Sequence, residues 1–419
     1  MELRQAFRKI PAWEHRFYRI YDPTVGSDRE ISDLLAWHRE LAPLVQDPVT
    51  IAHLGILEGE TARLNLLRGQ TDRWRTQAPE PLRSLAFLLQ SAYLDVPLSD
   101  QPERVLAFVR ETLPPGWFRN RLEERLARKM GDPKSISDIQ RSEAARSGRL
   151  LDRYRFMTGL DLVILFAFAL ALPVFFRYPS GFWRFGPASI PPRWPRMSGA
   201  TVLIRGFAVG ILLGFVPGFF VRAPDAVANL ISYMLWSLPI LFLAKRHLFN
   251  PDQLRPRNEL GLAIPSSAWK KLAVVLLVGL GIDSVGSWLL SRAGGLLQLP
   301  DHWAESFEPD LVWGGRFTLG ASLAGIILLG PWVEEVVFRG LLYGTFRTSY
   351  GWLPSAVLSA GLFSFVHGYG LLGFAAGFWS GVVYAWIYEK SGSLLPGFAV
   401  HALGNLLFSL NLIVMFRLP

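Results

Sequence analysis

Hydrophobic residues follow two different patterns along this chain and divide it into two parts. Up to residue 156 they recur three or four positions apart among polar residues, as Leu34, Trp37 and Leu41 do, which is typical of short amphipathic helices. Prolines punctuate these stretches, so turns are expected between them. We therefore predict a soluble helical domain over residues 1–130, followed by a basic linker over residues 131–155 that could continue as a helix.

Long apolar segments replace this pattern from residue 156 onward. They cover residues 156–176, 206–221, 226–244, 272–290, 317–332, 353–366, 371–388 and 395–416. Several fall near or below the roughly 20 residues of an ideal membrane span, as expected in a bundle that encloses polar groups. The sequence therefore predicts an all-α fold, in which residues 156–419 form a polytopic membrane helix bundle of about seven to eight transmembrane segments.

Composition supports this division and excludes several kinds of site. Hydrophobic residues make up 51% of the chain, and 22 of the 34 acidic residues lie before residue 157. The net charge of +9 is better explained by basic loops that bind membrane lipids than by nucleic acid, which we do not expect as a partner. Because the chain has no cysteine, disulfides, thiolate metal sites and a cysteine nucleophile are excluded.

Signals for membrane orientation conflict. The N-terminus lacks the apolar core of a signal peptide, so we expect an integral protein of a bacterial or archaeal cytoplasmic membrane with its N-terminal domain in the cytoplasm. The basic loop 245–271 should also be cytoplasmic, and the acidic loop 301–310 should lie outside. Three spans between the N-terminal domain and loop 245–271 would place the two on opposite sides. We therefore expect the short second segment, with Arg205 at its mouth, to lie in the interface or re-enter, which leaves seven crossings.

Three apolar segments near the C-terminus contain strongly polar side chains. They are Glu334, Glu335 and Arg339 in the first segment, His367 in the second, and His401 and Asn405 in the third. Ionisable groups at bilayer depth are costly and usually face a protein interior or a water-filled cavity, so we expect one shared active site. A spacing of four residues places the two members of a polar pair on one helix face, which lets each segment direct its polar side chains to a common point.

These residue types supply what peptide hydrolysis needs. Glu334 has no obvious local partner and can act as a general base, with His367 sharing the attacking water. His401 and Asn405 can donate hydrogen bonds to an oxyanion, although the same two residues also fit hydrogen bonding between helices. Asp161 and Asp283 also lie in apolar segments, and we expect them to be helix-start or water-facing residues.

The polar residues resemble the three motifs of one family of membrane proteases. The motifs are a double Glu followed by Arg (Glu334, Glu335, Arg339), then Phe-x-x-x-His (Phe363, His367), then His-x-x-x-Asn (His401, Asn405). In this order they resemble the CPBP family of CAAX prenyl proteases and bacteriocin-processing enzymes, also called Abi. The resemblance covers residues 317–410 and does not extend to the N-terminal region.

The resemblance implies an intramembrane endopeptidase that hydrolyses a peptide bond of a membrane-associated protein or peptide. It also implies that Arg339 supports the site and takes no part in the chemistry. For Glu335 with Arg339 alone, a purely structural ion pair is the alternative. The family extends well beyond true prenyl proteases, so a prenylated substrate is not predicted.

Metal dependence stays open at this point. Two Glu and two His residues could bind zinc, and members of the resembled family have been classed as metalloproteases. A zinc site would use Glu334, His367 and His401. The chain has no His-Glu-x-x-His helix, and the resemblance also allows a metal-free glutamate mechanism. We favour that mechanism and no cofactor.

Two other kinds of function remain alternatives. The chain could be a non-catalytic membrane scaffold or immunity protein on the same fold, which the intact motifs argue against. It could also be a proton-coupled transporter, although the hydropathy pattern shows no inverted repeat. Residues 1–130 could bind a cytoplasmic partner or act as a substrate adaptor.

Overall fold

The computed structural model describes residues 34–40, 47–98, 101–214, 225–251, 254–297, 299 and 308–418. The end of the second predicted span and most of the acidic loop lie outside these residues. Two compact units are present, Met1–Met157 with Leu418, and Thr158–Arg417 with Pro419. The predicted limits of the domain and linker themselves stay predictions.

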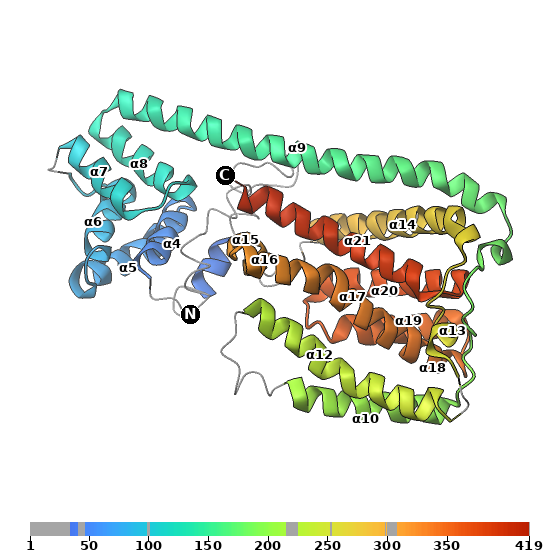
Figure 1. Cartoon of the computed structure of the whole chain (residues 1–419). Coiled ribbons are helices and arrows are strands. Elements are labelled where there is room, and N and C mark those ends of the chain that lie inside the picture. The colour runs from blue at the N-terminus through green and yellow to red at the C-terminus, as the bar shows by residue number, and fades with distance from the viewer. Residues whose placement is uncertain are drawn as a thin grey trace. The chain divides into compact units, whose positions relative to one another are not determined.

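The first unit consists of short helices, as the amphipathic pattern predicts. Its helices are α4 (Pro48–Glu60), α5 (Leu64–Gln77), α6 (Leu82–Tyr93), α7 (Pro102–Thr112) and α8 (Trp117–Met130) (Figure 1). Proline begins α4 and α7, where its missing N–H costs no helical hydrogen bond. Asp47 caps α4 by accepting from the N–H of Thr50, and Gly131 ends α8 in the left-handed region, with φ of 67°.

The predicted linker and the first predicted span form one helix. Helix α9 runs without a break from Pro133 to Arg177, over 45 residues. In its second half, large apolar side chains such as Phe156, Phe166 and Leu170 are exposed in the isolated chain. Because large exposed apolar surface is unfavourable in water, this half of α9 has the surface of a lipid-facing helix.

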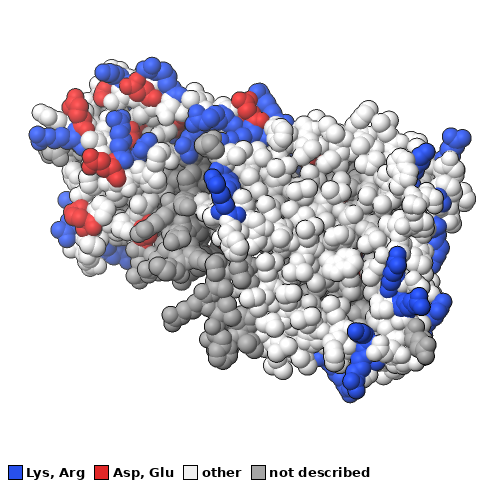
Figure 2. Space-filling model, viewed as in Figure 1, with Lys and Arg blue, Asp and Glu red and all other residues white. Residues whose placement is uncertain are grey.

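The second unit is a bundle of apolar helices. These are α10 (Arg196–Gly214), α12 (Asp225–Ala244), α14 (Trp269–Leu296), α19 (Trp352–Phe365), α20 (Leu371–Ser391), α21 (Leu394–Leu412) and a continuous helical stretch from Arg316 to Arg347. The described residues contain no strand, so the all-α prediction is confirmed. Within them, six helices are long and apolar enough to cross a membrane. In Figure 2 the middle of the visible face of this unit is almost free of charged side chains, and Lys and Arg gather at its right-hand end, in contrast to the mixed charges on α5 to α8.

Each predicted apolar segment corresponds to a helix, but two differ from expectation. Helix α19 has only 14 residues. Helix α10 begins ten residues before the predicted second segment, so Arg205 lies in the middle of an apolar helix of 19 residues. The assumption that Arg205 marks the mouth of a short segment is therefore wrong, because the helix extends through residues too polar to be recognised as part of a span. Which side of the membrane each loop faces stays a prediction.

The helical stretch from Arg316 to Arg347 forms the centre of the bundle and is irregular. Its α-helical parts α16 (Arg316–Leu323), α17 (Gly330–Glu334) and α18 (Gly344–Arg347) alternate with π-helical η6 (Ala324–Leu329) and η7 (Glu335–Tyr343). Pro331 has no N–H to donate to the preceding turn, which favours the wider turn of η6. Such π-helical turns leave backbone carbonyls available and are frequent at functional sites.

Small residues let the helices around this stretch approach closely. A Cβ atom at Gly381 of α20 would lie 2.7 Å from the Cβ of Ala360 on α19 and 3.1 Å from Nη2 of Arg339. A Cβ atom at Gly397 of α21 would lie 3.5 Å from Oε2 of Glu335. Glycine at these positions brings α20 and α21 against the polar side chains of η7.

Candidate active site

The four predicted catalytic residues line one cavity. Glu334 ends α17, His367 lies two residues after α19, and His401 and Asn405 project from α21. The cavity has a volume of about 590 Å³ and is lined by all four, together with Phe363. Three segments separated by up to 71 positions in the sequence therefore contribute to one site.

Glu335 and Arg339 form a fully buried ion pair beside this cavity. Nη1 of Arg339 donates to Oε1 of Glu335 over 2.9 Å, and the two side chains, arginine first, are 0% and 1% exposed. The guanidinium lies 4.2 Å from the ring centroid of Phe363 and 5.1 Å from that of Tyr384. Such cation–π contacts stabilise a desolvated cation, which compensates for the absence of a hydrogen-bond partner at Nε and Nη2 in the described part of the chain.

His401 lies between the two glutamates. Its Nδ1 is 3.1 Å from Oε1 of Glu335, and its Nε2 is 3.6 Å from Oε2 of Glu334. The first distance is a hydrogen bond and the second is too long for one. Glu335 therefore holds Nδ1 of His401. Nε2 of His401 and the carboxylate of Glu334 lie next to each other without a hydrogen bond, and both residues line the cavity.

His367 presents one nitrogen to the cavity. Its Nδ1 lies 2.7 Å from the carbonyl oxygen of Phe363, and because a carbonyl only accepts, Nδ1 must donate. The remaining nitrogen, Nε2, then has a lone pair that can accept a hydrogen bond from water. The imidazole also packs edge-on against the Phe363 ring, with centroids 4.8 Å apart.

Asn405 is hydrogen-bonded to the irregular helical stretch from Arg316 to Arg347. Its Nδ2 donates to the backbone carbonyl of Ile326 over 2.8 Å, and Ile326 lies in π-helical η6. An amide nitrogen carries two N–H groups, so one donor remains after this bond. Asn405 lines the cavity, which makes that donor available to a bound group.

The zinc ligand set suggested by the sequence, Glu334, His367 and His401, lines this cavity, and metal dependence stays a prediction. Glu334 and His401 are 3.6 Å apart, and the hydrogen bond from His367 Nδ1 to the Phe363 carbonyl leaves Nε2 of His367 open. No group of three or more His, Asp or Glu side chains suited to hold a metal ion is found among the described residues. No step below is therefore derived through a metal.

Asp283 is a cavity-lining residue whose position the sequence analysis did not predict. It lies in the middle of α14 and is 8% exposed, so it is not a helix-start residue. Ser380 Oγ donates to its Oδ1 over 2.7 Å, and the Tyr384 hydroxyl donates to its Oδ2 over 3.4 Å. The sequence feature that could have indicated this site is the pair Ser380 and Tyr384, whose hydroxyl groups lie four positions apart and therefore on one face of α20. Asp161 also lines the cavity, from α9.

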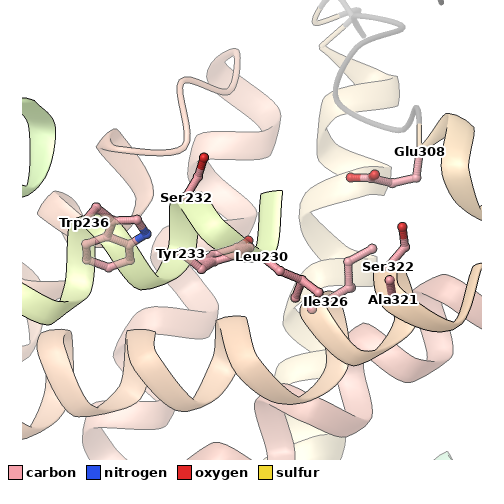
Figure 3. Close-up of a pocket in the computed structure, with 9 residues that line it drawn as sticks. Leu230, Ser232, Tyr233, Trp236, Glu308, Ala321, Ser322 and Ile326 are labelled. Carbon is pink, nitrogen blue, oxygen red and sulfur yellow. The ribbon is translucent and has the colours of Figure 1, made fainter. Parts of the chain in front are cut away.

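Two smaller cavities adjoin the first. One, of about 330 Å³, shares Tyr233, Glu308 and Ile326 with it, and Figure 3 shows Glu308 on the opposite side of this space from the α12 residues. Glu308 lies outside the membrane-spanning segments, and burial raises its pKa, as does the neighbouring Asp310. The other, of about 340 Å³, is lined by Glu334 and His367 together with largely apolar residues (Phe207, Ile211, Tyr233, Trp236, Phe338, Val366).

The fold and this site define an integral membrane protein whose helix bundle encloses a Glu, His and Asn site. Residues 317–407 match a family model described as type II CAAX prenyl endopeptidase Rce1-like. The matched residues include all three motifs, and the match confirms the predicted resemblance to the CAAX protease family. No curated protein and no solved structure matches the chain. The Rce1-like match supports a protease of the CAAX family.

Proposed function

We propose that the chain is an intramembrane endopeptidase that hydrolyses a peptide bond of a membrane-associated protein or peptide with a glutamate-activated water. The observation that carries this proposal is the convergence of Glu334, His367, His401 and Asn405 on one cavity inside a membrane bundle. A metal-free mechanism is proposed because these side chains can perform each step as they are arranged.

Glu334 and His367 activate the attacking water. A water between them donates one hydrogen to the Glu334 carboxylate and the other to Nε2 of His367, whose Nδ1 is already used by Phe363. Glu334 takes the first proton as the water oxygen bonds to the scissile carbonyl carbon. The carbonyl oxygen becomes an oxyanion in the tetrahedral intermediate.

Oxyanion stabilisation belongs to His401 and Asn405, which lie one turn apart on α21. Asn405 offers the N–H that is not bonded to Ile326. His401 offers Nε2–H in the form of the ring in which both nitrogens are protonated, because Glu335 already accepts from Nδ1–H. Donors that are already oriented cost no reorganisation during the reaction and act strongly where water is excluded.

Peptide cleavage then returns the site to its starting state. The carbonyl re-forms, the carbon–nitrogen bond breaks, and the proton held by Glu334 passes to the leaving amine nitrogen. Glu335 and Arg339 take no part in these transfers, since their buried pair holds His401 Nδ1 in place. Phe363 supports the site by contacting His367, His401 and Arg339.

The two adjoining cavities give a substrate room beside the cavity of the catalytic residues. The largely apolar cavity that contains Glu334 and His367 suits an apolar residue of the substrate, and the cavity that contains Glu308 suits a polar one. An extended peptide near the membrane surface is therefore the proposed substrate class. We also propose that the helix bundle binds membrane lipids and that residues 1–130 bind a cytoplasmic partner.

The test is cleavage of a peptide library by protein purified in detergent, with Glu334→Gln as the matched variant. Gln has the shape of Glu but cannot take the proton, so cleavage should fall by about 10² to 10⁴-fold while the melting temperature stays near that of the wild type. Equal cleavage by both proteins would overturn the assignment of Glu334. No cleavage by the wild type on any peptide would favour a non-catalytic scaffold.

A further inference from the structure

The Asp283 carboxylate is a buried charged group that the proposed reaction does not use. An acid inside a membrane bundle is costly and is retained where it performs a task. Each of its oxygens accepts one hydroxyl, from Ser380 at 2.7 Å and from Tyr384 at 3.4 Å. Both hydroxyls come from α20, so Asp283 holds one face of that helix against α14.

The contact between α14 and α20 is fixed on either side of Asp283. Nε1 of Trp379 donates to the carbonyl of Ile282 over 3.2 Å. One turn further along α14, a Cβ atom at Gly286 would lie 2.0 Å from the same Nε1, so only glycine leaves room for the indole. These contacts fix the position of α20 along the axis of α14 and thereby place the Tyr384 hydroxyl beside the Asp283 carboxylate.

The ring of Tyr384 connects Asp283 to the candidate active site. It is stacked on the imidazole of His401, with centroids 4.9 Å apart and an interplanar angle of 24°. Phe363 meets the same imidazole edge-on, with centroids 6.0 Å apart at 88°. Glu335 holds Nδ1, but a single hydrogen bond leaves the imidazole plane free to tilt about it. The face of Tyr384 is the contact that sets this plane.

We propose that Asp283 is a positioning residue, which acts through the Tyr384 hydroxyl and ring to hold the His401 imidazole with Nε2 directed into the cavity. A carboxylate suits this position because it can accept from both hydroxyls at once. An amide there has only one acceptor oxygen, so one of the two hydroxyls would face an N–H and would have to turn. The effect on catalysis rests on the proposed protease function, whereas the positioning of His401 does not.

The first test needs no substrate. In protein labelled at histidine and held in detergent micelles, the Cε1–H resonance of His401 is identified by its loss in His401→Gln. A ring stacked on an aromatic face feels that ring's magnetic shielding, so Asp283→Asn and Tyr384→Phe should both move or broaden this resonance. Tyr388→Phe is the matched control, since Tyr388 lies one turn along α20, is equally buried and donates to the carbonyl of Glu259. Its spectrum should match the wild type.

The second test is a double-mutant cycle on cleavage of a peptide found in the library. Asp283→Asn should lower kcat by about 10 to 100-fold, the cost of a misplaced group, with KM unchanged because no substrate contact is lost. If Asp283 acts through Tyr384, the double variant with Tyr384→Phe should be no slower than the slower single variant. A control of the same chemical kind is Asp47→Asn in the first unit, since Asp47 is as buried as Asp283 and accepts the Thr50 hydroxyl over 3.2 Å; this variant should leave kcat unchanged.

The outcomes separate this inference from the proposed function. An unchanged His401 resonance in both Asp283→Asn and Tyr384→Phe overturns the positioning role, whether or not the protein cleaves peptides. If the double variant loses kcat by the product of the two single losses, Asp283 does not act through Tyr384. If Asp283→Asn does not fold, the His401 resonance is compared between Tyr384→Phe and Tyr388→Phe. A shift in the first variant alone supports the positioning role of Tyr384, and no shift in either overturns it. A shifted resonance in a protein without cleavage keeps the inference and rejects the protease.

Discussion

The same four-residue spacing of an acid and an arginine occurs in both units, with different consequences. In α8, Nη2 of Arg128 lies 2.7 Å from Glu124, and the arginine side chain is 59% exposed. In η7, Nη1 of Arg339 lies 2.9 Å from Glu335, and neither side chain is more than 1% exposed. The two pairs have nearly the same geometry, so their difference lies in the surroundings alone.

This comparison shows that local spacing specifies a pair but not its importance. Water and salt screen the pair in α8, and Glu124 keeps a second partner in Arg121, so little depends on Arg128. The pair in η7 is removed from water, and each partner compensates the charge of the other. It also holds His401, so its loss affects both folding and the candidate active site.

The largest expected effect follows from breaking the buried pair. Glu335→Gln leaves the Arg339 charge buried without a counter-charge, which should lower the free energy of unfolding by about 3–5 kcal/mol. Denaturant unfolding of the purified protein in detergent measures this. An unfolding midpoint equal to that of the wild type would show that the pair contributes nothing to stability.

A second prediction concerns His38 of the first unit, a buried ionisable group for which the described residues supply no counter-charge. Burial lowers the pKa of His38 from 6.5 to about 4, despite the opposing hydrogen bond with the Leu34 carbonyl. Burial also lowers the pKa of His53, with a smaller effect from His38. Below about pH 6.5 the unfolded chain binds a proton that the folded chain does not, so acid favours unfolding until His38 titrates near pH 4.

The expected loss from His38 is about 3 kcal/mol over this pH range. Hydrogen exchange of α4 and α8 as a function of pH measures it, because these helices carry His53 and its stacking partner Phe118. His38→Gln should flatten the dependence, whereas His247→Gln, at an exposed position in the second unit, should not. Equal slopes in all three proteins would contradict the assignment.

A third effect separates polar groups that serve folding from those that serve the reaction. Asn405→Ala removes an oxyanion donor and should lower kcat by roughly 10²-fold with little change in KM. Asn120 is a buried asparagine of the first unit, 5% exposed, and Asn120→Ala should lower stability while kcat stays at the wild-type value. Steady-state cleavage of one peptide by both variants makes the comparison, and a similar kcat for the two would remove Asn405 from the oxyanion site.

The smallest effect is expected at the exposed member of the α8 pair. Arg128→Gln should change the free energy of unfolding by less than about 1 kcal/mol, since Glu124 still accepts from Arg121 over 2.8 Å. Thermal unfolding at low and high salt measures it, with Glu335→Gln run alongside. A loss as large as that of Glu335→Gln would end the contrast between the two pairs.

The sequence by itself determined the class of fold and the identity of the motif residues. Apolar runs and helical periodicity are local properties, so each predicted span corresponds to a helix. Residues four apart, such as Glu335 and Arg339, pair as helical spacing alone predicts. The motif order led to the family that the match over residues 317–407 supports.

Tertiary structure decided which groups from different helices meet. Asp283 and Tyr384 are 101 positions apart, and Asn405 donates to the carbonyl of Ile326, which lies 79 positions before it in a π-helical turn. Glu334, His367 and His401 line one cavity only because three separate helical segments pack together. Distances between helices depend on close packing at residues such as Gly286 and on hydrogen bonds across the bundle, and no pattern along a single segment encodes them.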